Sequence, residues 1–210
     1  MSDASRRPIW RFASLALLAF VAIMFVRPHG NPPNELASAY GGERVWLGEP
    51  GSHTKALVFR SVSASGSPHL VIVLHGDAPT ERPGYHYRFA AEVARTFPNT
   101  VAVGLLRPGY TDPVGDRSDG ERGLTTGDNY TPAVVAQLAT AIAQLQAQLH
   151  PARTTLVGHS GGAALAALLL ERRPDLAQRA LLVSCPCDLP AFRSHMARLQ
   201  LNPMWFLPVA

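Results

Sequence analysis

The chain has 210 residues, of which 47% are hydrophobic and 16% are charged, enough for one globular domain with a hydrophobic core. Its formal net charge is +4, but the first 27 residues account for +3 of this through four arginines against one aspartate. The remainder is nearly neutral and shows no basic patch, which argues against a nucleic-acid partner.

Residues 1–27 are predicted to form a signal anchor or a signal peptide. Three arginines precede an uncharged apolar run from Phe12 to Val26 and a fourth follows it directly, and the run spans roughly 22 Å as a helix at about 1.5 Å per residue. Extending the run to residues 9–26 gives a marginal single membrane span, and the arginines ahead of it favour a cytoplasmic N-terminus.

Two outcomes are open for this segment. It is either cleaved after the small residues 37–39 or kept as an anchor, and the long, proline-containing stretch before residue 37 favours the anchor. The arginine pair also resembles a twin-arginine export signal. We therefore expect a membrane-anchored or exported protein, with a linker over residues 28–42 and a domain over residues 43–210.

The domain alternates predicted strands with predicted helices. Strands are expected at residues 44–48, 55–62, 69–77, 100–109, 154–158 and 179–185, and helices at residues 85–97, 131–150 and 161–173. The second helix has a clear start, with Thr131 as N-cap and Pro132 at the first helical position. This alternation predicts an α/β fold with a mostly parallel sheet and helices on both faces.

Residues 158–162 read Gly-His-Ser-Gly-Gly and fit the pattern G-x-S-x-G between a strand and a helix. A sharp strand-to-helix turn forces the serine into a strained conformation, so its neighbours must be small. The turn also presents the hydroxyl of Ser160 at a helix N-terminus, where free N–H groups can stabilise an oxyanion. The alternatives are a glycine-rich turn with a chance serine and a phosphate-binding loop.

With this elbow in its context, the chain resembles the α/β-hydrolase family from about Val45 to Leu189. The His75-Gly76 pair after the third strand and the sequence RPGYTD at residues 107–112 also match that family. The resemblance implies that Ser160 is the nucleophile and that the backbone N–H groups of Asp77 and Gly161 form an oxyanion hole.

The two histidines beside these motifs have structural interpretations. We expect His75 to brace loops and His159, inside the elbow, to point away from the nucleophile. No cofactor is expected for this chemistry.

A serine nucleophile needs a histidine base and a carboxylate that orients it. Glu171 and Asp175 lie at the far end of the elbow helix, about 16 Å or more from Ser160, and cannot serve. Asp188 and His195 form a formally allowed acid/base pair of poor geometry. The resemblance implies two further strand–helix units, so we expect the domain to be C-terminally incomplete and the truncated chain to be impaired.

Cys185 and Cys187 are separated by one proline. We interpret them as two small apolar side chains, because such close neighbours do not readily reach disulfide geometry. No second Cys or His pair has zinc-ligand spacing, so no metal site is predicted.

Three functions remain in competition. The first is a serine hydrolase that cleaves a small-molecule ester or amide through an acyl-enzyme on Ser160. The others are a non-catalytic binding module of the same fold and a membrane-anchored scaffold in which the elbow is only architecture. The intact serine between its glycines favours the hydrolase.

Overall fold

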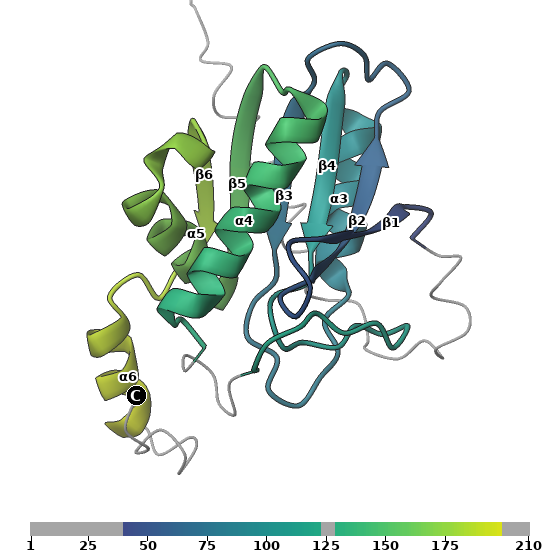
Figure 1. The fold of residues 1–210 in the computed structure, drawn as a ribbon. Helices are drawn as coiled ribbons and strands as arrows, with labels where there is room; N and C mark the ends of the chain where they lie inside the picture. The colour runs from purple at the N-terminus through teal and green to yellow at the C-terminus, as the bar shows by residue number, and fades with distance from the viewer. Residues whose placement is uncertain (1–39, 123–128, 199–210) are drawn as a thin grey trace, which may run out of the picture. The chain divides into compact units, whose positions relative to one another are not determined.

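One mixed sheet forms the centre of the domain in the computed structural model, which describes residues 40–122 and 129–198 (Figure 1). Its strand order is β1-β2-β4-β3-β5-β6. The strands are β1 (Glu43–Leu47), β2 (Thr54–Arg60), β3 (His69–Leu74), β4 (Thr100–Leu105), β5 (Arg153–His159) and β6 (Arg179–Val183). β2 runs antiparallel to β1 and β4, whereas β4, β3, β5 and β6 are parallel, which confirms the predicted mostly parallel sheet.

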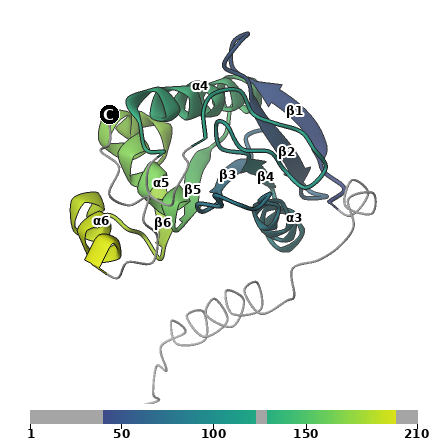
Figure 2. The same cartoon turned by 90° about the horizontal axis from the view of Figure 1, so that it is seen from below.

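Helices cover both faces of this sheet, as predicted. The helices are α3 (Tyr85–Thr96), α4 (Pro132–Leu149), α5 (Gly161–Arg172) and α6 (Leu189–Arg198), with a short 3-10 helix η1 (Pro174–Leu176). Figure 2 shows α3 on one face and α4 with α5 on the other. Each face has its own hydrophobic cluster, and β3 and β4 contribute to both because their apolar runs are buried throughout.

The start of α4 follows the sequence prediction. The Thr131 side chain accepts a hydrogen bond from the Val134 N–H at 3.3 Å, and Pro132 occupies the first turn. The apolar stripe of α4 then packs into the core through Val134, Val135, Leu138, Ile142 and Leu145.

Strand register brings the predicted motifs to one edge of the sheet. Leu74 of β3 pairs with both Leu105 of β4 and Gly158 of β5, so these three strands end in one row. This is the carboxyl edge, the lower edge of the sheet in Figure 1. The segments after residues 74, 105 and 158 therefore meet there, which is where parallel α/β sheets place their binding sites.

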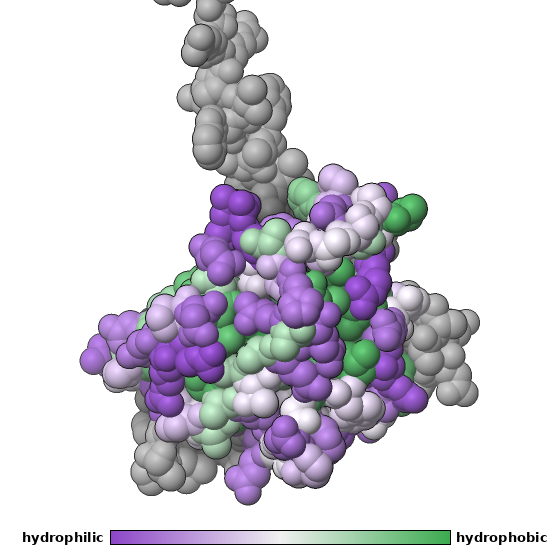
Figure 3. Space-filling view, turned by 45° about the horizontal axis from the view of Figure 1, so that its top comes forward, coloured by the Kyte–Doolittle hydropathy of each residue, from purple (hydrophilic) through white to green (hydrophobic). Residues whose placement is uncertain are grey.

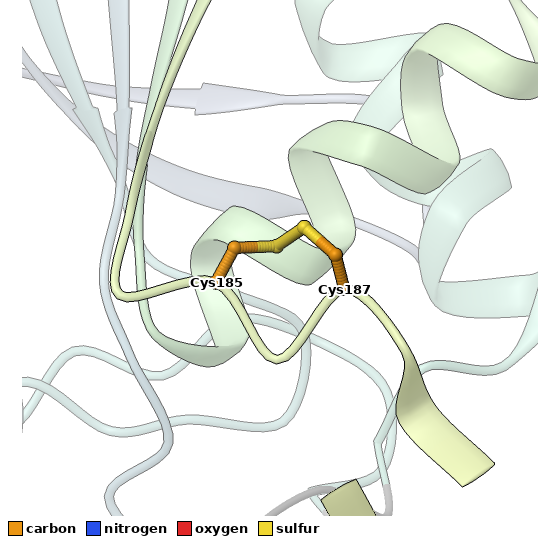
Figure 4. Close-up of a disulfide and its surroundings, with 2 residues drawn as sticks. All are labelled: Cys185 and Cys187. Carbon is orange, nitrogen blue, oxygen red and sulfur yellow. A yellow bond between two sulfur atoms is a disulfide. The ribbon is translucent and has the colours of Figure 1, made fainter. Parts of the chain in front are cut away.

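The structure corrects the interpretation of the two cysteines. Cys185 and Cys187 form a disulfide at the bend after β6 (Figure 4), with their Cα atoms 5.1 Å apart. The bend draws the two Cα atoms into the range that disulfides need, which an extended strand end would not do. The helix α6 that follows this bend was not predicted from the sequence.

The predicted span at residues 9–26, and residues 28–39 of the predicted linker, lie outside the described residues. Within residues 40–122 and 129–198, no helix is both long and apolar enough to cross a membrane. The face in Figure 3 is mostly hydrophilic, with smaller hydrophobic areas between.

Candidate active site

Ser160 occupies the sharp turn between β5 and α5. Its backbone has φ 51° and ψ −120°, a conformation that non-glycine residues rarely adopt and that costs about 1–3 kcal/mol. The Ser160 N–H donates to the Val183 carbonyl of β6 at 2.8 Å, which ties the turn to the neighbouring strand. Among the described residues, no side chain forms a hydrogen bond with the Ser160 hydroxyl, and the residue is half-buried.

Close packing explains the glycines that flank the serine. A Cβ on Gly158 would overlap the backbone of Gly162 and Ala163, and a Cβ on Gly162 would overlap the carbonyl oxygens at the end of β3. The first turn of α5 thus lies directly against the end of β3, which brings Gly76 beside the elbow: a Cβ there would lie 3.2 Å from the Ser160 Cβ. The elbow therefore packs too closely for side chains at Gly158 and Gly162, as the sequence predicts for the neighbours of the serine.

His75 braces two loops, as its structural interpretation predicts. Its Nδ1–H donates to the Gly76 carbonyl at 2.7 Å, while its Nε2 accepts the Arg107 N–H at 3.0 Å. The ring is fully buried, and burial, followed by the electrostatic interactions with nearby His86 and Arg107, lowers its pKa well below the usual value. A neutral imidazole with one donor and one acceptor nitrogen fits both hydrogen bonds.

A second chain of hydrogen bonds holds the other side of this turn. The Gly76 N–H donates to the Tyr85 hydroxyl oxygen at 2.6 Å, and that hydroxyl donates to His159 Nδ1 at 2.8 Å. Burial raises the pKa of Tyr85 to about 12, so the phenol keeps its proton. Burial also lowers the pKa of His159, which favours the neutral ring that accepts this bond.

The Asp77 side chain lies at the elbow, where the sequence had suggested a role only for its backbone. Its Oδ1 accepts from Arg107 Nη1 at 2.8 Å and its Oδ2 accepts from the Tyr130 hydroxyl at 2.6 Å. Although burial alone lowers the pKa of Arg107, the Asp77 carboxylate raises it above the usual value. Burial and Asp77 likewise raise the pKa of Tyr130, so the phenol remains a donor.

The loop that carries Arg107 is itself held by a buried ion pair. Lys55 on β2 contacts Asp112, both side chains are almost fully buried, and the Lys55 ammonium lies 4.5 Å from the centre of the Tyr87 ring. The other Asp112 oxygen accepts the N–H groups of Val114 and Asp116, each at 3.0 Å. The RPGYTD segment at residues 107–112 is therefore fixed at both its first and its last residue.

The structure does not bring Asp188 and His195 together as an acid/base pair. Asp188 precedes α6, and its carboxylate accepts the Ala191 N–H at 2.9 Å, as an N-cap does. His195 lies within α6, seven residues after Asp188, and is exposed, about 10 Å further along the helix axis at about 1.5 Å per residue. Among the described residues, no hydrogen bond or ion pair joins either side chain to Ser160.

Sequence reasoning missed the side chains of Asp77, Arg107, Tyr85 and Tyr130. The only signal was the placement of Asp77 and Arg107 directly after buried strands, where polar residues gather at a site. Their pairing spans 30 residues and the Asp77–Tyr130 bond spans 53, and no local pattern reveals such contacts.

A family model described as "Alpha/beta hydrolase family" matches residues 71–209, about two thirds of the chain. The chain belongs to the α/β-hydrolase family. Among curated proteins, no sequence matches it.

Several solved structures share the α/β-hydrolase fold with this chain. XC6422 of Xanthomonas campestris, described as an α/β serine hydrolase without a lid, is 18% identical with a TM-score of 0.50, over 66% of this chain and 59% of its own. Proline iminopeptidase of Mycobacterium smegmatis is 20% identical with a TM-score of 0.52, over 76% and 50%. Est1E of Butyrivibrio proteoclasticus, in its complex with ferulic acid, is 14% identical with a TM-score of 0.56, over 72% and 56%.

At these identities the likeness shows a shared fold, and the chain spans 50–59% of the length of these three structures.

An open groove of about 770 Å³ lies elsewhere on this domain, between β2 and the end of α3. It opens at the amino-terminal edge of the parallel strands, opposite the elbow, and is not part of the candidate site.

Proposed function

We propose that this chain carries the nucleophile and the oxyanion hole of a serine hydrolase that cleaves esters or amides. The observation that supports this most strongly is the strained backbone of Ser160, held at the N-terminus of α5 beside the turn after β3. Strain of this kind persists where the surrounding structure enforces it, and it is found mainly at functional sites.

The proposed reaction proceeds through an acyl-enzyme. The Ser160 oxygen attacks the substrate carbonyl carbon as a base removes its proton, and the resulting oxyanion accepts hydrogen bonds from the backbone N–H groups of Asp77 and Gly161. Collapse of this intermediate breaks the bond to the alcohol or amine, which takes the proton from the base. Water then adds to the acyl-enzyme and releases the acid and the serine.

We further propose that the base which serves Ser160 comes from a longer form of the protein. Two facts support this: Asp188, just before α6, and His195, within α6, lie apart, and the chain spans only 50–59% of the length of the three solved structures named above. In this proposal the 210-residue chain is a truncated and impaired hydrolase, since loss of the general base costs about 10⁴–10⁶ in turnover.

A comparison of two proteins tests the proposal. Turnover of a short p-nitrophenyl ester is measured for the 210-residue chain and for the same chain extended by its native downstream coding sequence, each with and without Ser160→Ala. We expect turnover by the extended protein only, abolished by Ser160→Ala. Equal turnover by both lengths contradicts the missing base, and turnover that survives Ser160→Ala contradicts the nucleophile.

The membrane location remains part of the proposal. The arginine-flanked apolar run at residues 9–26 supports a domain that is held at a membrane or exported. A non-catalytic binding or scaffold module of the same fold is the alternative, but no contact among the described residues favours it over the hydrolase.

A further inference from the structure

A buried charged cluster lies beside the oxyanion hole proposed above. The Asp77 and Arg107 side chains are 2% and 0% exposed, and a 2.8 Å bond joins them. The Tyr130 hydroxyl donates to the second carboxylate oxygen at 2.6 Å. Three residues from three separate segments, after β3, after β4 and before α4, thus meet at one carboxylate.

Stability alone is a poor explanation for this cluster. Two charges taken out of water lose hydration free energy that their attraction often fails to recover, so a buried ion pair is weak evidence of a stabilising role. Arg107 makes the loss larger, because its Nε and Nη2 have no hydrogen-bond partner within residues 40–122 and 129–198. The rings of Tyr110 and Tyr130, at 5.0 and 5.7 Å from the guanidinium carbon, offset only part of it.

The position of the carboxylate suggests what the cluster does. A Cβ on Gly161 would overlap Asp77 Oδ1 and would lie 2.5 Å from the Tyr130 hydroxyl, so the cluster touches the residue after the nucleophile. Asp77 and Gly161 are also the two residues whose N–H groups form the proposed hole. The same side chain therefore belongs to one N–H donor and packs against the other.

Resting on the proposed hydrolase function, we propose that Arg107 and Tyr130 are positioning residues that act through the Asp77 carboxylate to fix the spacing of the two oxyanion donors. Arg107 is itself anchored, since its N–H donates to His75 Nε2 at 3.0 Å. Arg107 and Tyr130 hold Asp77 by its carboxylate, and the contact of that carboxylate with Gly161 sets the distance between the N–H groups of Asp77 and Gly161. Arg107 also neutralises a carboxylate that would otherwise repel the developing oxyanion.

The rate of covalent labelling tests this. The protein extended by its native downstream coding sequence, which in the proposal above supplies the base, is treated with a fluorophosphonate probe at several concentrations, well below its melting temperature, so that kinact and KI are separated. The variants are Tyr130→Phe, which removes one donor, and Asp77→Asn, which keeps the shape but removes the charge. Tyr40→Phe is the matched control, because it removes a phenol hydroxyl on the α3 face, where its ring packs against Tyr87.

We expect kinact to fall about tenfold in Tyr130→Phe and further in Asp77→Asn, with KI within about twofold of the wild type. This is less than the 10²–10³ lost when an oxyanion donor is deleted outright, because here the donors are displaced rather than removed. Tyr40→Phe should match the wild type. A purely structural cluster would lower the melting temperature of the variants and leave kinact unchanged.

The outcomes separate this inference from the function on which it rests. If the wild type is labelled, Ser160→Ala is not, and both cluster variants keep the wild-type kinact, then the positioning network alone is overturned. Faster labelling of Asp77→Asn also overturns it, because charge and not position would then control the hole. No labelling of the wild type, or equal labelling of Ser160→Ala, overturns the proposed nucleophile and the network together.

Discussion

His86 is the least compensated polar side chain in the described core. It is fully buried on α3, packs against His75 with ring centres 4.8 Å apart, and neither of its ring nitrogens has a hydrogen-bond partner in residues 40–122 and 129–198. Burial, followed by the nearby Lys55 cation, lowers its pKa well below the usual value. The folded protein therefore holds this ring neutral where an unfolded chain would protonate it.

This makes acid stability depend on His86. The folded pKa of His86 lies below the unfolded value of about 6.5. The free energy of unfolding is therefore unaffected by this residue above that pH, and it decreases as the pH falls below about 6.5, because the unfolded chain then binds a proton that the folded protein does not. Between pH 7.5 and 5.5 the loss is about 1.4 kcal/mol for such a residue. We expect His86→Phe to lose about 1.4 kcal/mol less than the wild type over this interval, measured by urea unfolding at both pH values.

Phe89→Leu is the control for this measurement, because it alters another aromatic of α3 without removing a histidine. It should change the unfolding free energy equally at the two pH values. If His86→Phe and the wild type lose the same stability between pH 7.5 and 5.5, His86 is not held neutral in the folded state.

At the scale of secondary structure, the bend between β6 and α6 is fixed by its own short crosslink. The Cys185–Cys187 disulfide joins residues only two apart, and Asp188, which caps α6, follows directly. The stabilisation from a disulfide grows with the length of the closed loop, so this one constrains the unfolded chain little. Its effect should therefore be local.

We expect reduction by dithiothreitol to lower the free energy of unfolding by less than about 2 kcal/mol. Thiol titration in denaturant should find no free thiols in protein purified without reductant and two after reduction. The Cys185→Ser, Cys187→Ser double variant is the control and should not respond to dithiothreitol. Two free thiols in the unreduced protein would restore the interpretation of the cysteines as apolar side chains.

The elements that could be predicted from the sequence are those with a local physical signal. In the sequence, β3 and β4 are recognised as apolar runs, α4 as a capped amphipathic helix, and the elbow as glycines around a serine. The bend at residues 184–188 has no such signal, because a turn that brings two cysteines together looks like any Pro-containing segment. The carboxylate of Asp77 was missed for a different reason, since its partners are set by the fold and not by the neighbouring sequence.

At the scale of the whole molecule, the carboxyl edge of the sheet brings the segments of the candidate site together. Ser160, the turn after β3 and the loop after β4 meet there. β6 is one of the two edge strands of the described sheet, with Leu182 37% exposed. An apolar outer strand is open to pairing with further strands, which agrees with a proposed longer form.

In the proposed location, residues 9–26 hold the molecule at a membrane or direct its export, and they carry no acidic or basic side chain other than Arg11. Expressed in a bacterium, the 210-residue chain should sediment with membranes and resist an alkaline carbonate wash, because about 18 residues of apolar helix approach the length that spans a bilayer. If the segment is cleaved instead, the protein should be shorter by roughly the first 39 residues and lie outside the cytoplasm.

A Leu17→Arg, Phe20→Arg variant is the control for this fractionation, since two charges at the centre of the span cost about 2.5–3.5 kcal/mol each. It should abolish both outcomes. Uncleaved wild-type protein in the soluble cytoplasmic fraction would contradict the anchor and the export signal alike.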